Sequence, residues 1–201
     1  GMNSYGFRHA LLAEAVYDDL LPGERMGLHT TYAQAMQERV GVSTPGALAR
    51  HAFASHDLAT ALTASIEAGR KAMAVGGPDE AARHFERALE VYDRASALMD
   101  EPPVLAELVG RASEAISASG MPYRALTIVN EQLDRVPDDS PQRAQLLVAA
   151  AEAALVTEPE VNPFELTSEA LGLIGPEPTT LRAHALAAHA MAALWNDDEL
   201  T

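Results

Sequence analysis

Alanine supplies 39 of the 201 residues, and the alanine-rich stretches are separated by short clusters of glycine and proline. Alanine has the highest helix propensity of all residues and little preference for strands. No window alternates apolar and polar residues for long enough to indicate a strand. Aromatic residues make up only 5% of the chain, and small side chains allow helix axes to approach closely. These features predict an all-α fold of about ten antiparallel helices joined by short turns.

The breaks between helices follow from proline, glycine and capping residues. Asp57 is a typical N-cap, and a helix does not continue through the residue that precedes a proline. We expect a short helix that follows Pro45 and ends near Ser55. The other helices are expected over residues 7–20, 23–39, 57–75, 78–99, 103–119, 122–136, 141–157, 163–174 and 178–196.

Composition excludes several classes of protein. The chain carries 14 basic and 29 acidic residues, for a formal net charge of −15, which argues against binding of nucleic acid. The chain has no cysteine, so a disulfide scaffold and a thiolate zinc site are excluded. No apolar run is long enough to span a membrane, and no secretory signal precedes the first helix. We therefore expect a cytoplasmic protein.

No recognisable catalytic or metal-binding motif is present. The pairs His51/His56 and His184/His189 are each five residues apart, about 140° around a helix, so neither pair can face one ion. Asp138–Asp139 lies among prolines and lacks a third carboxylate within a helical turn, which favours a solvated turn. We expect that the chain is not an enzyme and holds neither a metal nor a cofactor of its own.

A helical repeat is indicated by Gly69, Ala81, Phe85 and Ala88. Their offsets place a small residue in one helix where it meets the next, and then a small, a bulky and a small residue on one face of that second helix. This pattern resembles the tetratricopeptide repeat (TPR), in which hairpins of helices stack into a superhelix. Each such unit buries its apolar face only by stacking on its neighbour.

The same pattern recurs less perfectly in two later copies. The second has Ser113, Gly120, Ala125, Val129, Leu133 and Pro137, and the third has Ala151, Thr167, Ala170 and Leu171, with Pro163 in place of a small residue. The units are expected near residues 62–95, 106–139 and 144–177, followed by a final helix over 178–196. Whether the helix over 57–75 closes one unit or opens the next stays open.

The N-terminal segment carries a more specific resemblance. Its matched residues are Phe7, His9, Ala10, Leu11, Glu14, Ala15, Tyr17, Leu20, Glu24, Arg25, Leu28 and His29, and the likeness continues through 49–51 and 68–76. The segment resembles the region after the ATPase module in large ATP-binding LuxR-family transcriptional regulators. These are signal-transduction ATPases related to the maltose-regulon activator, and a similar module accompanies some nucleotide cyclases.

In that family an ATPase module is followed by a winged-helix region, a TPR-like sensor array and a helix-turn-helix. The resemblance implies that residues 1–40 are the C-terminal part of the winged-helix or linker region, and that 41–201 form the array. This sequence has no phosphate loop, so ATP or ADP is expected only on the ATPase module of a parent protein. The resemblance also implies that His9 senses nucleotide in the intact parent, with a backbone-bonded histidine at a helix start as the alternative.

Binding is expected on the first helix of each unit, which lines the concave face of a TPR superhelix. In the family's register the groove positions are Thr63, Ile66, Arg70, Met73, Glu107, Glu114, Ser117, Gln145, Glu152 and Leu155. Mixed polar and apolar groups at these places suit a small-molecule inducer, a protein or a peptide. An ordinary solvated helix face is the alternative.

Together these patterns predict a non-catalytic sensor or protein-interaction region of a LuxR-family ATP-dependent transcriptional regulator. Its partners would be an effector or peptide and, within the parent, the ATPase module, with no contact to nucleic acid or membrane. A free-standing TPR adaptor and an accessory region of a nucleotide cyclase or kinase are the alternatives. Assembly into a homo-oligomer stays open.

Overall fold

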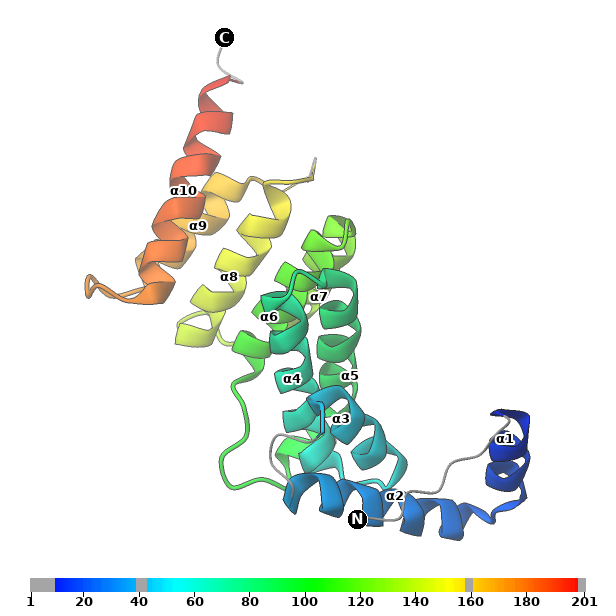
Figure 1. The fold of residues 1–201 in the computed structure, drawn as a ribbon. Helices are drawn as coiled ribbons and strands as arrows, with labels where there is room; N and C mark the ends of the chain where they lie inside the picture. Colours follow the sequence, from blue (N-terminus) through cyan, green and yellow to red (C-terminus); the bar gives the residue numbers. More distant parts are fainter. Residues whose placement is uncertain (1–9, 39–42, 158–160, 199–201) are drawn as a thin grey trace.

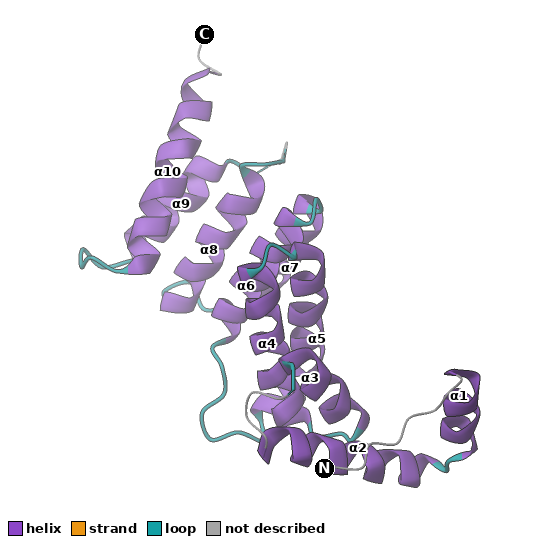
Figure 2. Ribbon diagram, in the orientation of Figure 1, coloured by secondary structure: helices purple, strands orange, loops and turns teal. Residues whose placement is uncertain are grey.

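The computed structural model describes residues 10–38, 43–157 and 161–198, and these residues form ten α-helices and no strand (Figure 2). The all-α prediction is therefore confirmed. In chain order the helices are α1 (Ala10–Asp19), α2 (Pro22–Glu38), α3 (Pro45–Ala54), α4 (Leu58–Ala74), α5 (Pro78–Ser96), α6 (Leu105–Ala118), α7 (Pro122–Leu133), α8 (Pro141–Ala154), α9 (Pro163–Leu173) and α10 (Thr180–Asp198).

Proline and capping side chains set where the helices begin. Six of the ten described helices start at proline, which lacks the N–H that would be unpaired in the first turn. The Asp57 carboxylate accepts a hydrogen bond from the Thr60 N–H at 3.1 Å, so the predicted N-cap is confirmed. The turns after α4 and α6 contain Gly76 and Gly120 at φ +76° and +87°, a region that favours glycine.

The observed helix ends differ from the expected ones mainly at C-termini. α5 ends at Ser96 rather than near residue 99, and α7 at Leu133 rather than 136. In both places the chain continues in a tighter turn, with hydrogen bonds three residues apart instead of four, as in Met99 N–H to Ser96 O at 3.2 Å. The expected start of the first helix at residue 7 lies outside the described residues.

The helices follow one another along an elongated stack, with α2 at one end and α10 at the other (Figure 1). α4 pairs with α5, α6 with α7, and α8 with α9, while α10 packs on α9 and α8. The first helices α6 and α8 also contact each other directly. The hairpins thus stack in sequence order, which is a helical-repeat arrangement.

The core is filled largely by alanine, at the positions that the repeat predicts. Ala81 and Ala88 are fully buried, and Phe85 is 1% exposed between them. The corresponding Ala125 and Val129 of the next unit and Thr167 of the third are also fully buried. The burial pattern supports the predicted register of all three hairpins.

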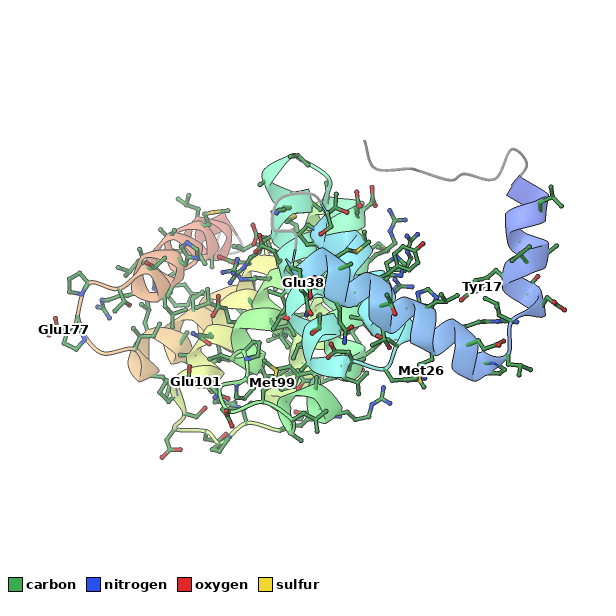
Figure 3. All side chains as sticks on the ribbon, turned by 60° about the horizontal axis from the view of Figure 1, so that its bottom comes forward. Tyr17, Met26, Glu38, Met99, Glu101 and Glu177 are labelled. Atoms are coloured by element: carbon green, nitrogen blue, oxygen red, sulfur yellow. The ribbon has the colours of Figure 1, made fainter. Side chains whose placement is uncertain are left out.

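The N-terminal helices stand apart from these hairpins. α2 packs against α3, whereas α1 projects from the beginning of α2, as the Tyr17 and Met26 labels show in Figure 3. Arg25 ties the two helices together, because its guanidinium donates to the carbonyl of Asp18 at 2.7 Å and to that of Leu20 at 3.0 Å. The expected domain boundary near residue 40 lies outside the described residues.

Within the described part of the chain, no helix is both long and apolar enough to cross a bilayer.

Candidate functional site on the first-helix face

The surface formed by α4, α6 and α8, the first helices of the three hairpins, is called here the first-helix face. It carries the residues that the repeat predicts for binding. Thr63, Arg70, Glu107, Glu114 and Glu152 are exposed on it. Ser117 and Gln145 are partly buried there. These seven of the ten predicted groove residues therefore have side chains that are exposed or partly exposed.

The part of the face between α4 and α6 carries an exposed ion-pair chain. A terminal nitrogen of Arg70 lies 3.5 Å from Glu107 Oε1, and the same oxygen accepts from the guanidinium of Arg111 at 2.8 Å. Both Arg70 and Glu107 are about half exposed, so this chain adds little to stability. Its effect is to neutralise the Glu107 carboxylate between two cations.

Between α6 and α8 the face is hollowed into a pocket of about 560 Å³. Glu114, Ser117 and Glu152, which the repeat register assigns to the groove, all line it. The remaining lining residues are Ser113, Ala118, Gly120, Pro122, Ala153 and Val156. The structure thus gathers three predicted residues from two helices into one concave site. The lining combines two carboxylates and two hydroxyls with small apolar groups.

The electrostatics of this pocket are set by two carboxylates. Although much of the Glu152 side chain is exposed, surrounding protein removes enough water to raise the pKa of its carboxyl group. The charge of His184 on α10 lowers this pKa, and the negative charge of Glu114, a smaller effect, raises it. The pocket thus carries two carboxylates, and His184 partly offsets the negative charge at Glu152.

Two serine hydroxyls of the pocket lack hydrogen-bond partners among the described residues. The Ser117 Oγ atom is buried and unpaired. Ser113 is 2% exposed and has no hydrogen bond to any described group. Buried hydroxyls are normally paired, because an unpaired one loses its hydration without compensation. These hydroxyl oxygens can therefore accept hydrogen bonds from a ligand.

Three predicted positions do not serve the face as expected. Ile66 is only 9% exposed and belongs to the main core, and Met73 packs partly buried against the same core. Leu155 is 5% exposed and packs with Ala188 of α10. Ile66 and Leu155 therefore offer little exposed surface for binding, because neighbouring helices cover these flanks of α4 and α8.

The Thr63 and Gln145 side chains lie away from the pocket. Thr63 lines a separate hollow of about 270 Å³ beside α2 and α3, and its hydroxyl donates to the Ala59 carbonyl at 3.1 Å. The Gln145 Oε1 atom is buried without a hydrogen-bond partner among the described residues. The structure therefore does not bring all the predicted residues together.

A histidine cluster joins α1, α2 and α3, and no sequence motif predicts it. The Tyr17 hydroxyl lies 2.9 Å from His29 Nε2, and His29 Nδ1 lies 2.8 Å from His51 Nδ1. The Tyr32 ring stacks on His51 with centroids 5.2 Å apart. Burial, followed by the charges of His29 and Arg50, lowers the pKa of His51. Only the fold brings together residues 22 positions apart, so spacing along the chain could not reveal the pair.

Two further expectations concern His9 and metal binding. His9 lies outside the described residues. Within the described ranges, no group of three or more histidines, aspartates or glutamates is arranged to hold a metal ion.

No protein-family model matches the chain, and no solved structure does. An uncharacterized protein of Rhizobium meliloti (strain 1021) is 30% identical over 128 residues. The match covers 57% of this chain but only 12% of that protein. The chain is thus similar to a small part of a much longer protein.

Proposed function

We propose that this chain is a non-catalytic sensor and interaction region of a LuxR-family ATP-dependent transcriptional regulator, and that it binds an effector or a partner on the first-helix face. Binding there would shift a switch controlled by the ATPase module, which requires different affinities for the two states of the switch. The parent protein would act in the cytoplasm.

The α6–α8 pocket carries this proposal. It lies between the first helices of consecutive hairpins, and three of its residues belong to the groove set expected from the repeat. Buried hydroxyls and a partly desolvated carboxylate are unfavourable for stability, so a binding role accounts for their presence. The N-terminal resemblance supports the family, and the much longer relative supports a place within a large chain.

A thermal-shift screen with metabolites and peptides tests the binding role, because any ligand of the folded state raises the melting temperature. Each stabilising compound is then measured on the charge-reversed variant Arg70→Glu/Glu114→Lys. The matched control is Arg94→Glu/Glu131→Lys, at exposed positions of the second helices α5 and α7. The proposal expects loss of stabilisation only in the first-helix variant. Equal stabilisation of both variants would contradict it.

The native reading frame tests the regulatory assignment. A LuxR-family regulator requires a phosphate loop upstream of this segment and a helix-turn-helix downstream. A frame with neither would favour a free-standing adaptor, and a cyclase or kinase domain in the same frame would favour an accessory region.

A further inference from the structure

Building on the proposed function, we infer that the α6–α8 pocket binds a cationic amine, an alkylammonium or guanidinium group carried on a short apolar stem. The ligand class follows from the acceptors in the pocket, the lack of an ion pair between its two carboxylates and any described basic residue, and the apolar groups of its lining. These three observations are independent of one another.

The first observation is the contrast between Glu107 and the pocket carboxylates. Glu107 lies against two arginines, at 3.5 and 2.8 Å. Neither Glu114 nor Glu152 forms an ion pair with a described basic residue, although the charge of His184 on α10 acts on Glu152 more strongly than that of Glu114 does. Two carboxylates that line one pocket without an ion-pair partner repel each other, and a bound ammonium would relieve this repulsion.

The second observation is that the pocket contains the unpaired hydroxyls of Ser113 and Ser117. Ser113 is almost completely buried, lines the pocket, and has no hydrogen-bond partner among the described residues. The Ser117 hydroxyl beside it is also unpaired. Ionised carboxylates only accept hydrogen bonds, and serine hydroxyls can accept them as well. A ligand rich in N–H donors matches these groups, whereas an anionic ligand would meet two like charges.

The third observation is the set of apolar groups in the pocket lining. These are Ala118, Pro122, Ala153 and the exposed Val156. Methylene groups next to an ammonium pack on such a surface while the charged head stays among the acceptors. The net charge of −15 also raises the local concentration of cations and disfavours anions.

An amine of this kind comes either from a small metabolite or from a lysine or arginine side chain of a partner. Two probes separate these sources in titration calorimetry at neutral pH and low ionic strength. One is cadaverine, with diacetylated cadaverine as its neutral control. The other is a lysine-rich peptide, with the same peptide acetylated at every lysine as its control.

The test variant is Glu114→Gln/Glu152→Gln, and its matched control is Glu131→Gln/Glu177→Gln. The control removes the same charge from exposed positions, and Glu177 lies at the tip of the loop before α10 (Figure 3). We expect saturable binding of at least one cationic probe, a loss of at least tenfold in affinity for the pocket variant, and a much smaller loss for the control. Ser113→Ala, a small-to-small change, should weaken binding severalfold without altering the fold.

Binding of cadaverine alone identifies a small-molecule effector, and binding of the peptide alone identifies a protein partner. The inference is overturned if neither cationic probe binds saturably, or if both double variants lose affinity equally. If a neutral or anionic compound from the thermal-shift screen instead depends on the first-helix face, the amine inference fails and the proposed function stands. If no ligand of any charge depends on this face, the proposed function fails as well.

Discussion

The Phe85 ring lies against the backbone of Gly69 so closely that a Cβ atom on residue 69 would come within 2.6 Å of the ring. The two residues belong to the two helices of the first predicted repeat unit, α4 and α5. Phe85 is 1% exposed, so the ring has no room to retreat. The contact explains why the repeat places a small residue opposite a bulky one.

Gly69→Ala should therefore destabilise the chain, even though alanine is the better helix former. Overpacking of a buried contact costs about 1–3 kcal/mol, which for a chain of this size lowers the melting temperature by about 2–4 °C per kcal/mol. Circular dichroism recorded during heating measures this change in melting temperature.

Gly110→Ala is the matched control, because Gly110 is also helical but a Cβ there would meet nothing within 4 Å. It should stabilise the chain by about 0.4–1 kcal/mol. If Gly69→Ala stabilised the chain as Gly110→Ala does, Phe85 of α5 would not pack against Gly69 of α4.

Phe85→Ala tests the same hairpin from the other side. Removal of a fully buried aromatic ring leaves a cavity and costs about 3–5 kcal/mol. Urea unfolding followed by helical signal measures this loss. A change within about 0.5 kcal/mol, the range of ordinary surface substitutions, would show that Phe85 does not occupy the repeat's bulky position.

From the contact between His29 and His51 we expect the chain to lose stability in mild acid. Because the folded state lowers the pKa of His51 from its ordinary value of 6.5, the unfolded chain takes up the proton more readily. Stability is thus fully present above pH 6.5 and falls as the pH drops through that value, with His29 and Arg50 opposing protonation from either side. Melting temperatures measured across this range should show the fall.

His51→Gln should flatten that acid dependence. His56→Asn is the control, since His56 is exposed and its φ of 60° is one that asparagine tolerates. The control should keep the slope of the wild type. An unchanged slope in His51→Gln would show that protonation of His51 does not cause the loss of stability in acid.

Glu152→Gln should stabilise the unliganded chain at neutral pH. The folded state raises the pKa of Glu152 above its ordinary value of 4.5, so its ionised form opposes folding. This gain is present above the raised pKa, shrinks as the pH falls, and vanishes below 4.5, where wild-type Glu152 is also neutral. Because the side chain is partly exposed, solvent screening keeps the gain below about 1 kcal/mol. Melting curves at neutral and acidic pH check it, and a destabilised variant at neutral pH would contradict it.

Local sequence signals were sufficient for much of the fold. Proline at helix starts, Asp57 as a cap and glycine in the turns mark boundaries by short-range physics, and the observed helices follow them. The offset from Gly69 to Phe85 predicts a contact between adjacent helices, which the structure confirms. Helix ends were less well predicted, because terminal turns tighten gradually.

The site was predictable only in part. Helical periodicity places Glu114, Ser117 and Glu152 on exposed faces of first helices, and the stack brings them into one pocket. Periodicity does not tell which flank a later helix covers, and Leu155 is buried because α10 packs over it. Contacts between distant helices, such as His29 with His51, depend on the full tertiary arrangement.

Backbone amide chemical shifts show where a ligand binds, and so they test binding on the first-helix face. The ¹⁵N-labelled chain is titrated with the most strongly stabilising compound of the thermal-shift screen. We expect the largest shift changes on residues 113–122 of α6 and the following turn, and on residues 152–156 at the end of α8. Largest changes on the second helices α5 and α7, or around α1 and α2, would contradict it.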